Sequence, residues 1–244
     1  MKESKISSRT LLAASVIFVL VLVSGPLGYK FGWLLLSPSI ISLLVGLLGV
    51  ILVALSSLVM LSVAIKYKLT VDRNFLLVGL LVSLFPKIFI VPQAINGLSA
   101  PKINDISTDT SSPPLFDKLL ITQIDNNELS LSQYALSKEE RIKIQNHSYP
   151  ELKTLSSSLD FDSALIRSAA LLRHQGLEVI NIDEDKGIIE AVDTTFWFGF
   201  KDNVVVRLKS HGSGTKVDIR SASRIGLRDF GKNAERIRRF LEDF

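Results

Sequence analysis

The chain has 244 residues, 47% of them hydrophobic, with a mean hydropathy of +0.33. It contains no cysteine, which excludes a disulfide framework, a thiol nucleophile and a lipoprotein signal. The net charge of +4 is unevenly spread, because residues 1–100 carry 8 basic and 2 acidic side chains whereas residues 101–244 carry 20 and 22. The basic character therefore belongs to the apolar part of the chain and does not indicate nucleic acid as a partner.

Three apolar stretches in the first 95 residues are each long enough to cross a bilayer as a helix, which takes about 20 mostly apolar residues. They are residues 11–28, 40–65 and 75–95. The alternative for the first stretch is a cleavable signal peptide, since a basic tail precedes it, but the two further stretches favour a permanent span. We expect residues 1–98 to form a bundle of three transmembrane helices.

Basic residues near these stretches predict the orientation of the chain. The tail before the first stretch and the loop after the second each hold three, whereas the connection between them holds Lys30 alone. Lysine and arginine in short loops stay on the cytoplasmic side. We therefore expect a multi-pass protein of the bacterial inner membrane with its N-terminus in the cytoplasm. The C-terminal part then lies outside, in the periplasm of a Gram-negative cell, and the lipid bilayer is its first partner.

Two features lie inside the apolar stretches. Ser42, Gly46 and Gly49 are small residues of the kind that let membrane helices approach closely. Lys87, which follows Pro86, is an ionisable residue within the third stretch. It is either a functional residue or, as we favour, a side chain that extends toward the interface beyond a kinked helix.

Residues 99–116 are rich in proline, serine, threonine and aspartate and have no hydrophobic period, so they are predicted to be an extended linker. Residues 117–244 form the expected soluble domain. Within it, apolar residues after Asp160 recur at helical spacing, with Asp160 as the N-cap and Gly176 at the end of the helix. Two strands, 177–183 and 188–193, follow around a short turn.

The rest of the domain reads as further strands and a closing helix. Alternating phenylalanines at 196, 198 and 200 predict a strand, and a hairpin with its turn at 211–214 follows. Its register places Arg207 opposite Asp218, which predicts a structural ion pair. The final helix is amphipathic, with Asp229 expected as N-cap and Arg236 on the polar face. The domain is therefore predicted to be α+β, with an antiparallel sheet of about four to five strands packed with two helices.

A segment rich in arginine and serine runs from the last strand to the final helix. Guanidinium groups, hydroxyls and backbone N–H groups at such a position suit a phosphate or a carboxylate. The alternative is a structural network in which internal carboxylates neutralise the arginines. The candidate anion-binding residues are Arg220, Ser221, Ser223, Arg224 and Arg228.

No motif indicates catalysis. The chain lacks a nucleophile elbow, a phosphate-binding loop and a dinucleotide fingerprint. Its three histidines, His147, His174 and His211, are not at metal-ligand spacing. We assign no catalytic residue, no metal and no cofactor.

Several short sequences resemble a bacterial family known as domain of unknown function 1499 (DUF1499). They lie at residues 104–109, 113–114, 149–150, 189–191 and 217–237. The resemblance covers about residues 100–242, and Arg-Ser-Ala-Ser-Arg-Ile-Gly at 220–226 is its most specific part. Members often carry N-terminal membrane spans, and the family implies no activity. Where members tend to have two acidic residues before the fourth strand, this chain has Asp202-Asn203.

These observations predict an inner-membrane protein with an extracytoplasmic domain that binds a protein or an anionic envelope component. The alternative is an envelope hydrolase or transferase that uses the arginine-serine segment as an anion clamp.

Overall fold

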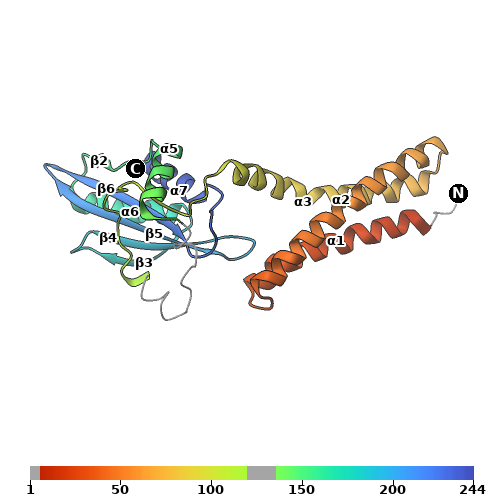
Figure 1. Cartoon of the computed structure of the whole chain (residues 1–244), viewed down its shortest axis with the longest axis horizontal. Coiled ribbons are helices and arrows are strands. Elements are labelled where there is room, and N and C mark those ends of the chain that lie inside the picture. Colours follow the sequence, from red (N-terminus) through yellow and green to blue (C-terminus); the bar gives the residue numbers. More distant parts are fainter. Residues whose placement is uncertain (1–5, 120–135) are drawn as a thin grey trace. The chain divides into compact units, whose positions relative to one another are not determined.

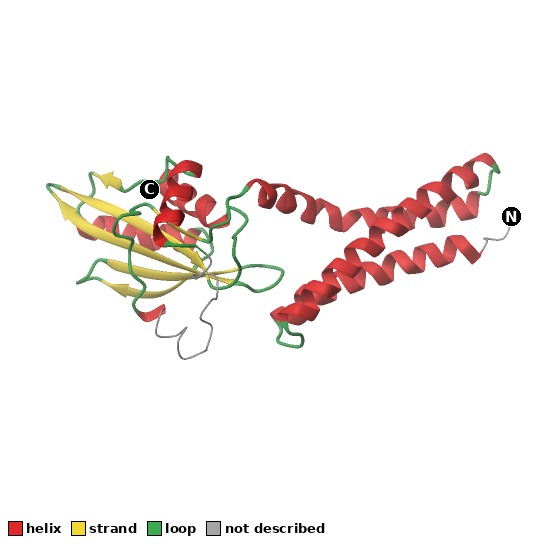
Figure 2. Ribbon diagram, viewed as in Figure 1, coloured by secondary structure: helices red, strands yellow, loops and turns green. Residues whose placement is uncertain are grey.

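The computed structural model describes residues 6–119 and 136–244, with the backbone alone at residues 6, 87, 89–96 and 98. The chain forms two compact units, one made of residues 1–95 and 196–199 and the other of residues 96–195 and 200–244. The elements are labelled in Figure 1 and coloured by type in Figure 2.

The first unit is helical, and the three predicted apolar stretches lie within its helices. These are α1 (Ile6–Lys30), α2 (Leu36–Lys66) and α3 (Thr70–Ser99). By length and composition, two of the helices in the described part of the chain are candidate membrane spans, Ser7–Lys30 and Leu36–Lys66, and not the three predicted. The third stretch is helical, but the side chain of Lys87 and those of most residues after it lie outside the described ones. The predicted role of Lys87 is therefore outside the description as well.

The small residues of α2 do bring it close to α1. A Cβ atom added at Gly46 would lie 2.5 Å from the backbone of Leu22, so only glycine fits there. Ser42 Oγ donates a hydrogen bond to the carbonyl oxygen of Val21 at 2.7 Å and lies 3.3 Å from Ser24 Oγ. The predicted close approach of the helices is confirmed, with α1 as the partner of α2.

The second unit is an α+β domain built on an antiparallel sheet in the order β1-β6-β5-β4-β3, with β2 also paired to β6. The strands are β1 (Asp105–Ser107), β2 (Leu155–Ser157), β3 (Glu178–Asp183), β4 (Ile188–Thr194), β5 (Lys201–His211) and β6 (Gly214–Ser223). Its helices are α5 (Lys138–Ser148), α6 (Phe161–His174) and α7 (Lys232–Asp243). The predicted fold class is confirmed, but the described residues form six strands rather than four or five, and α5 is an additional helix.

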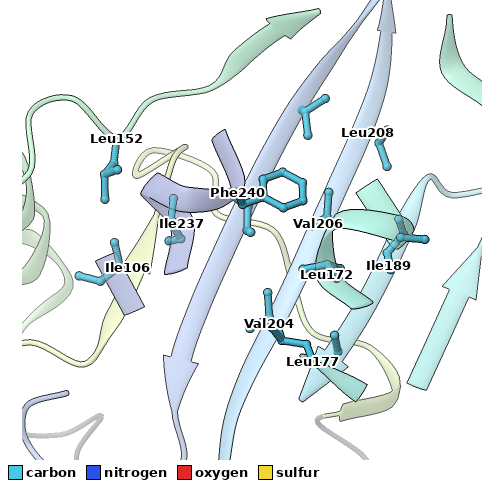
Figure 3. Close-up of a cluster of buried hydrophobic side chains, with 14 of the residues drawn as sticks. Ile106, Leu152, Leu172, Leu177, Ile189, Val204, Val206, Leu208, Ile237 and Phe240 are labelled. Carbon is cyan, nitrogen blue, oxygen red and sulfur yellow. The ribbon is translucent and has the colours of Figure 1, made fainter. Parts of the chain in front are cut away.

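The hydrophobic core lies between one face of the sheet and helices α6 and α7, a face called the helix face below. Alternate residues of the central strands point into it, among them Val204 and Val206 of β5, which are fully buried. They meet Leu172 of α6 and Phe240 of α7, both also fully buried (Figure 3). Each such side chain contributes about 1.5–3 kcal/mol relative to an exposed one.

Local signals explain α6. The side chain of Asp160 accepts a hydrogen bond from the backbone N–H of Ser163 at 2.8 Å, as an N-cap does. Gly176 follows the helix with φ of 85°, a left-handed conformation that favours glycine. Both predicted ends of this helix are confirmed.

The phenylalanines at 196, 198 and 200 do not form a strand, so that prediction is wrong. They lie in the loop between β4 and β5, which Thr195 and Phe200 close by a backbone hydrogen bond of 2.8 Å. Gly199 in this loop has φ of 68°, which breaks an extended run. The alternation reflects a loop rich in aromatic residues.

Residues 108–119, called the strap below, cross the face of the sheet opposite α6 and α7. We call this the strap face. The predicted linker, 99–116, thus contains β1 and most of the strap. At the outer edge of β1, the side-chain amide of Gln145 donates to the carbonyl oxygen of Ser107 at 2.6 Å and accepts from its N–H at 3.1 Å. This amide occupies backbone groups that a further strand would otherwise pair with.

Candidate functional site

The arginine-serine segment does not converge on one point. Successive residues of β6 point to opposite faces of the sheet, so Arg220 lies on the strap face and Ser221 on the helix face. Arg224 follows the strand and donates from Nε to Asn203 Oδ1 at 2.9 Å. Arg228 donates from Nη1 to the carbonyl oxygen of Gly97 at 3.2 Å. The five candidate residues therefore belong to several separate contacts.

On the strap face, Arg220 is engaged through all three of its nitrogens. Nε and Nη2 each donate to the carboxylate of Asp105 at 2.8 Å, in the two-pronged geometry that suits guanidinium and carboxylate groups. Nη1 donates to the carbonyl oxygen of Pro114 at 3.0 Å. The ring of Phe116 lies 4.8 Å from the guanidinium carbon. Arg220 thus joins β6 to β1 and to the strap.

The predicted pair of Arg207 and Asp218 is present next to it. The two residues face each other across β5 and β6, with Nη2 of the arginine 2.7 Å from Oδ2 of the aspartate. The same Nη2 lies 3.0 Å from Asp109 in the strap, and Nη1 donates to the carbonyl oxygen of Ser112 at 2.9 Å. Burial alone would raise the pKa of Asp109, but hydrogen bonds from Ser112 and Arg207 outweigh it and lower that pKa.

A third tie holds the end of the strap. Glu190 of β4 is completely buried, and its carboxylate accepts hydrogen bonds from three consecutive backbone N–H groups. The donors are Asp117 at 2.8 Å, Lys118 at 3.1 Å and Leu119 at 3.3 Å. The side-chain amide of Asn181 donates a fourth at 3.0 Å. Four N–H groups therefore converge on this one buried carboxyl group.

On the helix face, Arg236 of α7 is the centre of a buried polar network. Its Nη2 binds the carboxylates of Asp193 and Asp202, the latter at 2.9 Å. Its Nη1 donates to Ser221 Oγ at 2.6 Å and to Asn233 Oδ1 at 2.7 Å. Arg236 is 7% exposed, so the expectation that it lies on the polar face of the helix is wrong. The charge turns inward because two strand carboxylates meet it there.

Asp229 lies beside this network. Its carboxylate accepts from the backbone N–H groups of Gly231 and Asn233, both at 2.9 Å. The prediction that Asp229 is the N-cap of α7 is wrong, because the N-cap is Gly231. Asp229 nevertheless binds the start of the helix from two residues before the N-cap. Burial raises the pKa of Asp229, and the charge of nearby Asp202 raises it further, against the opposing effect of the two N–H donors.

These contacts define what the arrangement can do. An anion arriving at Arg220 would have to displace Asp105, whose carboxylate would then keep only the longer contact of 3.4 Å to Arg141. Ser221 is already bonded to both Asn233 and Arg236. Over residues 6–119 and 136–244, no three metal-ligating side chains lie together. The polar networks hold the strap and α7 against the two faces of the sheet.

The residues that sequence reasoning missed have no local signal. Glu190 lies in a mostly apolar strand, and its backbone donors come from residues more than 70 positions earlier. Arg236 reaches Asp193 across 43 positions. Only the tertiary fold brings these groups together.

The comparisons with known proteins agree with the resemblance seen in the sequence. Residues 105–244, more than half of the chain, match the family described as protein of unknown function (DUF1499). No curated protein and no solved structure matches the chain. The matched range begins at β1 and ends with α7, so it covers the sheet, the strap and both polar networks. The chain therefore belongs to the DUF1499 family.

Proposed function

We propose that this protein is anchored in the bacterial inner membrane by three helices and presents its α+β domain on the extracytoplasmic side as an interaction module. Two helices of the described chain have the length and composition of spans, and α3 contains the third apolar stretch. The excess of basic residues in the N-terminal tail and after α2 supports a cytoplasmic N-terminus. An odd number of crossings then exports the domain.

The pairing of Arg220 is the observation that favours an interaction module over an anion clamp. All three guanidinium nitrogens of this residue have partners within the domain. A hydrolase or transferase that uses the segment to hold a phosphate or an oxyanion needs donors that point to a substrate. The arginine-serine segment instead supports the scaffold, and an anionic envelope ligand is the weaker candidate partner for the same reason.

A protein of the cell envelope is the partner that the surface fits best. β3 is at the end of the strand order, so one side of it is an edge of the described sheet. Ile180 and Ile182 of this strand are 39% and 38% exposed. Exposed apolar residues on an edge strand suit an added strand or an apolar partner surface.

Single cysteines test the topology, because the chain has no native thiol. The variants Ser7→Cys, Lys68→Cys and Lys186→Cys mark the N-terminus, the loop after α2 and the α+β domain. In intact spheroplasts, a membrane-impermeant maleimide should label Lys186→Cys alone. Labelling of the other two should require a broken membrane.

The contrary result is equally clear. If Lys186→Cys is labelled only together with Lys68→Cys after the membrane is broken, α3 does not cross and the domain is cytoplasmic.

A photo-cross-linker tests the partner. Placed at Ile180, it should form an adduct in cells, and the second substitution Ile182→Asp should remove that adduct. The same probe at exposed Lys209 is the control.

A further inference from the structure

We propose that one end of the α+β domain docks on the surface of an anionic lipid bilayer. The inference rests on the membrane anchoring proposed above, and it adds a second contact between protein and lipid, made by the domain itself. Three chain segments form this end, called the docking end below. They are residues 100–104, residues 193–195 together with 200–202, and residues 224–232.

Strand register brings these segments together. The loop between β4 and β5 follows the pairing of Thr194 with Lys201. The last residue of β6, Ser223, pairs with Asp202 of β5. Its backbone N–H donates to the carbonyl oxygen of Asn104, the residue before β1. The side-chain amide of Asn104 also donates to the carbonyl oxygen of Gly226 at 2.6 Å. All three segments therefore lie at the same end of the sheet, opposite the β5–β6 turn.

Large apolar side chains are exposed at the docking end. Leu227 is 59% exposed, Phe230 53% and Ile225 40%. Phe230 has φ of 57°, a backbone conformation that aromatic residues rarely adopt. One phenylalanine and two aliphatic residues on one loop make the kind of apolar tip that enters the boundary between headgroups and acyl chains.

The charge of the docking end is basic on the outside. Lys102, Lys201 and Lys232 are all exposed there. The acidic groups of the same segments are turned inward: Asp193 and Asp202 bind Arg236, and Asp229 binds backbone N–H groups. Exposed lysines are attracted to anionic headgroups. An anionic lipid surface is therefore the occupant that matches both the apolar residues and the charges.

The connection to α3 is short and enters at this same end. α3 ends at Ser99 and β1 begins at Asp105, which leaves residues 100–104 between them. Five extended residues span at most about 18 Å. If α3 ends at a membrane interface, the docking end is the part of the domain that this tether keeps within reach of the headgroups.

Nitroxide labels on the full-length chain test the proposal. The variants Ile225→Cys and Leu227→Cys mark the docking end, and His211→Cys, in the β5–β6 turn, marks the opposite end. Each is spin-labelled and reconstituted in vesicles of phosphatidylethanolamine and phosphatidylglycerol. Labels at 225 and 227 should collide with oxygen dissolved in the lipid and lose collisions with an aqueous nickel chelate. The label at 211 should behave in the opposite way.

A fourth variant separates this inference from the proposed function. Leu44→Cys lies on α2, where Leu44 is 52% exposed, and reports whether that helix is in hydrocarbon. If labels at 225 and 227 are as accessible to the chelate as the label at 211 while the label at 44 is protected, docking is refuted and anchoring stands. If the label at 44 is also aqueous, the anchoring proposal fails. Unchanged protection at 225 and 227 in pure phosphatidylcholine would refute the choice of an anionic surface.

Discussion

Replacing Arg236 by methionine should destabilise the α+β domain severely. Methionine retains most of the apolar stem but removes the charge that Asp193 and Asp202 share. The side chains of Arg236 and Asp202 are each only 6% exposed, so water does not compensate for the loss. Removing one partner of a buried ion pair costs about 3–5 kcal/mol. That is a large part of the roughly 5–15 kcal/mol by which a typical domain is stable.

The measurement can use a buried thiol. Val206→Cys adds a single cysteine at a fully buried position of β5, and its labelling in urea reports unfolding of the sheet. With a urea dependence of about 2 kcal/mol per molar, a loss of about 4 kcal/mol lowers the midpoint by about 2 M. Arg239→Met is the matched control on the same helix, because that side chain is 56% exposed and pairs only with Glu235 one turn earlier.

Two outcomes decide the reasoning. The control should lower the free energy of unfolding by no more than about 0.5 kcal/mol, as loss of an exposed ion pair does, which moves the midpoint by about 0.25 M at most. Adding Asp193→Asn and Asp202→Asn to Arg236→Met should recover much of the lost stability, since a neutral set no longer buries an unpaired charge. If Arg236→Met is no more destabilising than Arg239→Met, the buried network does not hold α7 as described.

Three other predictions follow from single contacts. Gly46→Ala should separate α1 from α2 and abolish a disulfide engineered by replacing Ser24 and Ser42 with cysteines. Gly79→Ala should leave that disulfide intact, because a Cβ atom at Gly79 would lie 3.4 Å from its nearest neighbour. Because the pKa of Asp229 is raised above 3.8 in the folded state, its ionisation opposes folding. As pH rises from about 4 to about 7, the free energy of unfolding of Asp229→Asn should increase relative to that of the parent chain. A constant difference between the two would contradict this. Glu190→Gln should cost about 2 kcal/mol and expose the strap to trypsin at Lys118, because an amide presents N–H groups to N–H donors; an unchanged cleavage rate would count against this tie.

The elements that sequence predicted well are those whose signals are local. Asp160 and Gly176 mark the ends of α6 within one turn of the helix they bound. The pairing of Arg207 with Asp218 follows from a four-residue turn and strict alternation on two strands. In each case the residues that fix the structure lie within about a dozen positions of one another.

The elements that sequence missed depend on distant partners. β1 is three residues long and pairs with β6, so it has no pattern of its own. Helix α5 has a capping box between Ser137 and Glu140, but the residue that it buries is the polar Gln145, and its two isoleucines give no hydrophobic period. The candidate site was harder still: the sequence indicates the arginine-serine segment, but the groups that bind Arg220 and Ser221 come from β1, the strap and α7.

The pairing of β1 with β6 also bears on how the chain is made. Asp105 and Arg220 are separated by 115 positions, yet they form one of the closest ion pairs of the sheet. During synthesis, β1 leaves the ribosome long before its only strand neighbour exists. The nascent domain therefore waits for its C-terminal strand before it closes, and a chain truncated ahead of β6 leaves both β1 and β5 without that partner and open to chaperones or proteases.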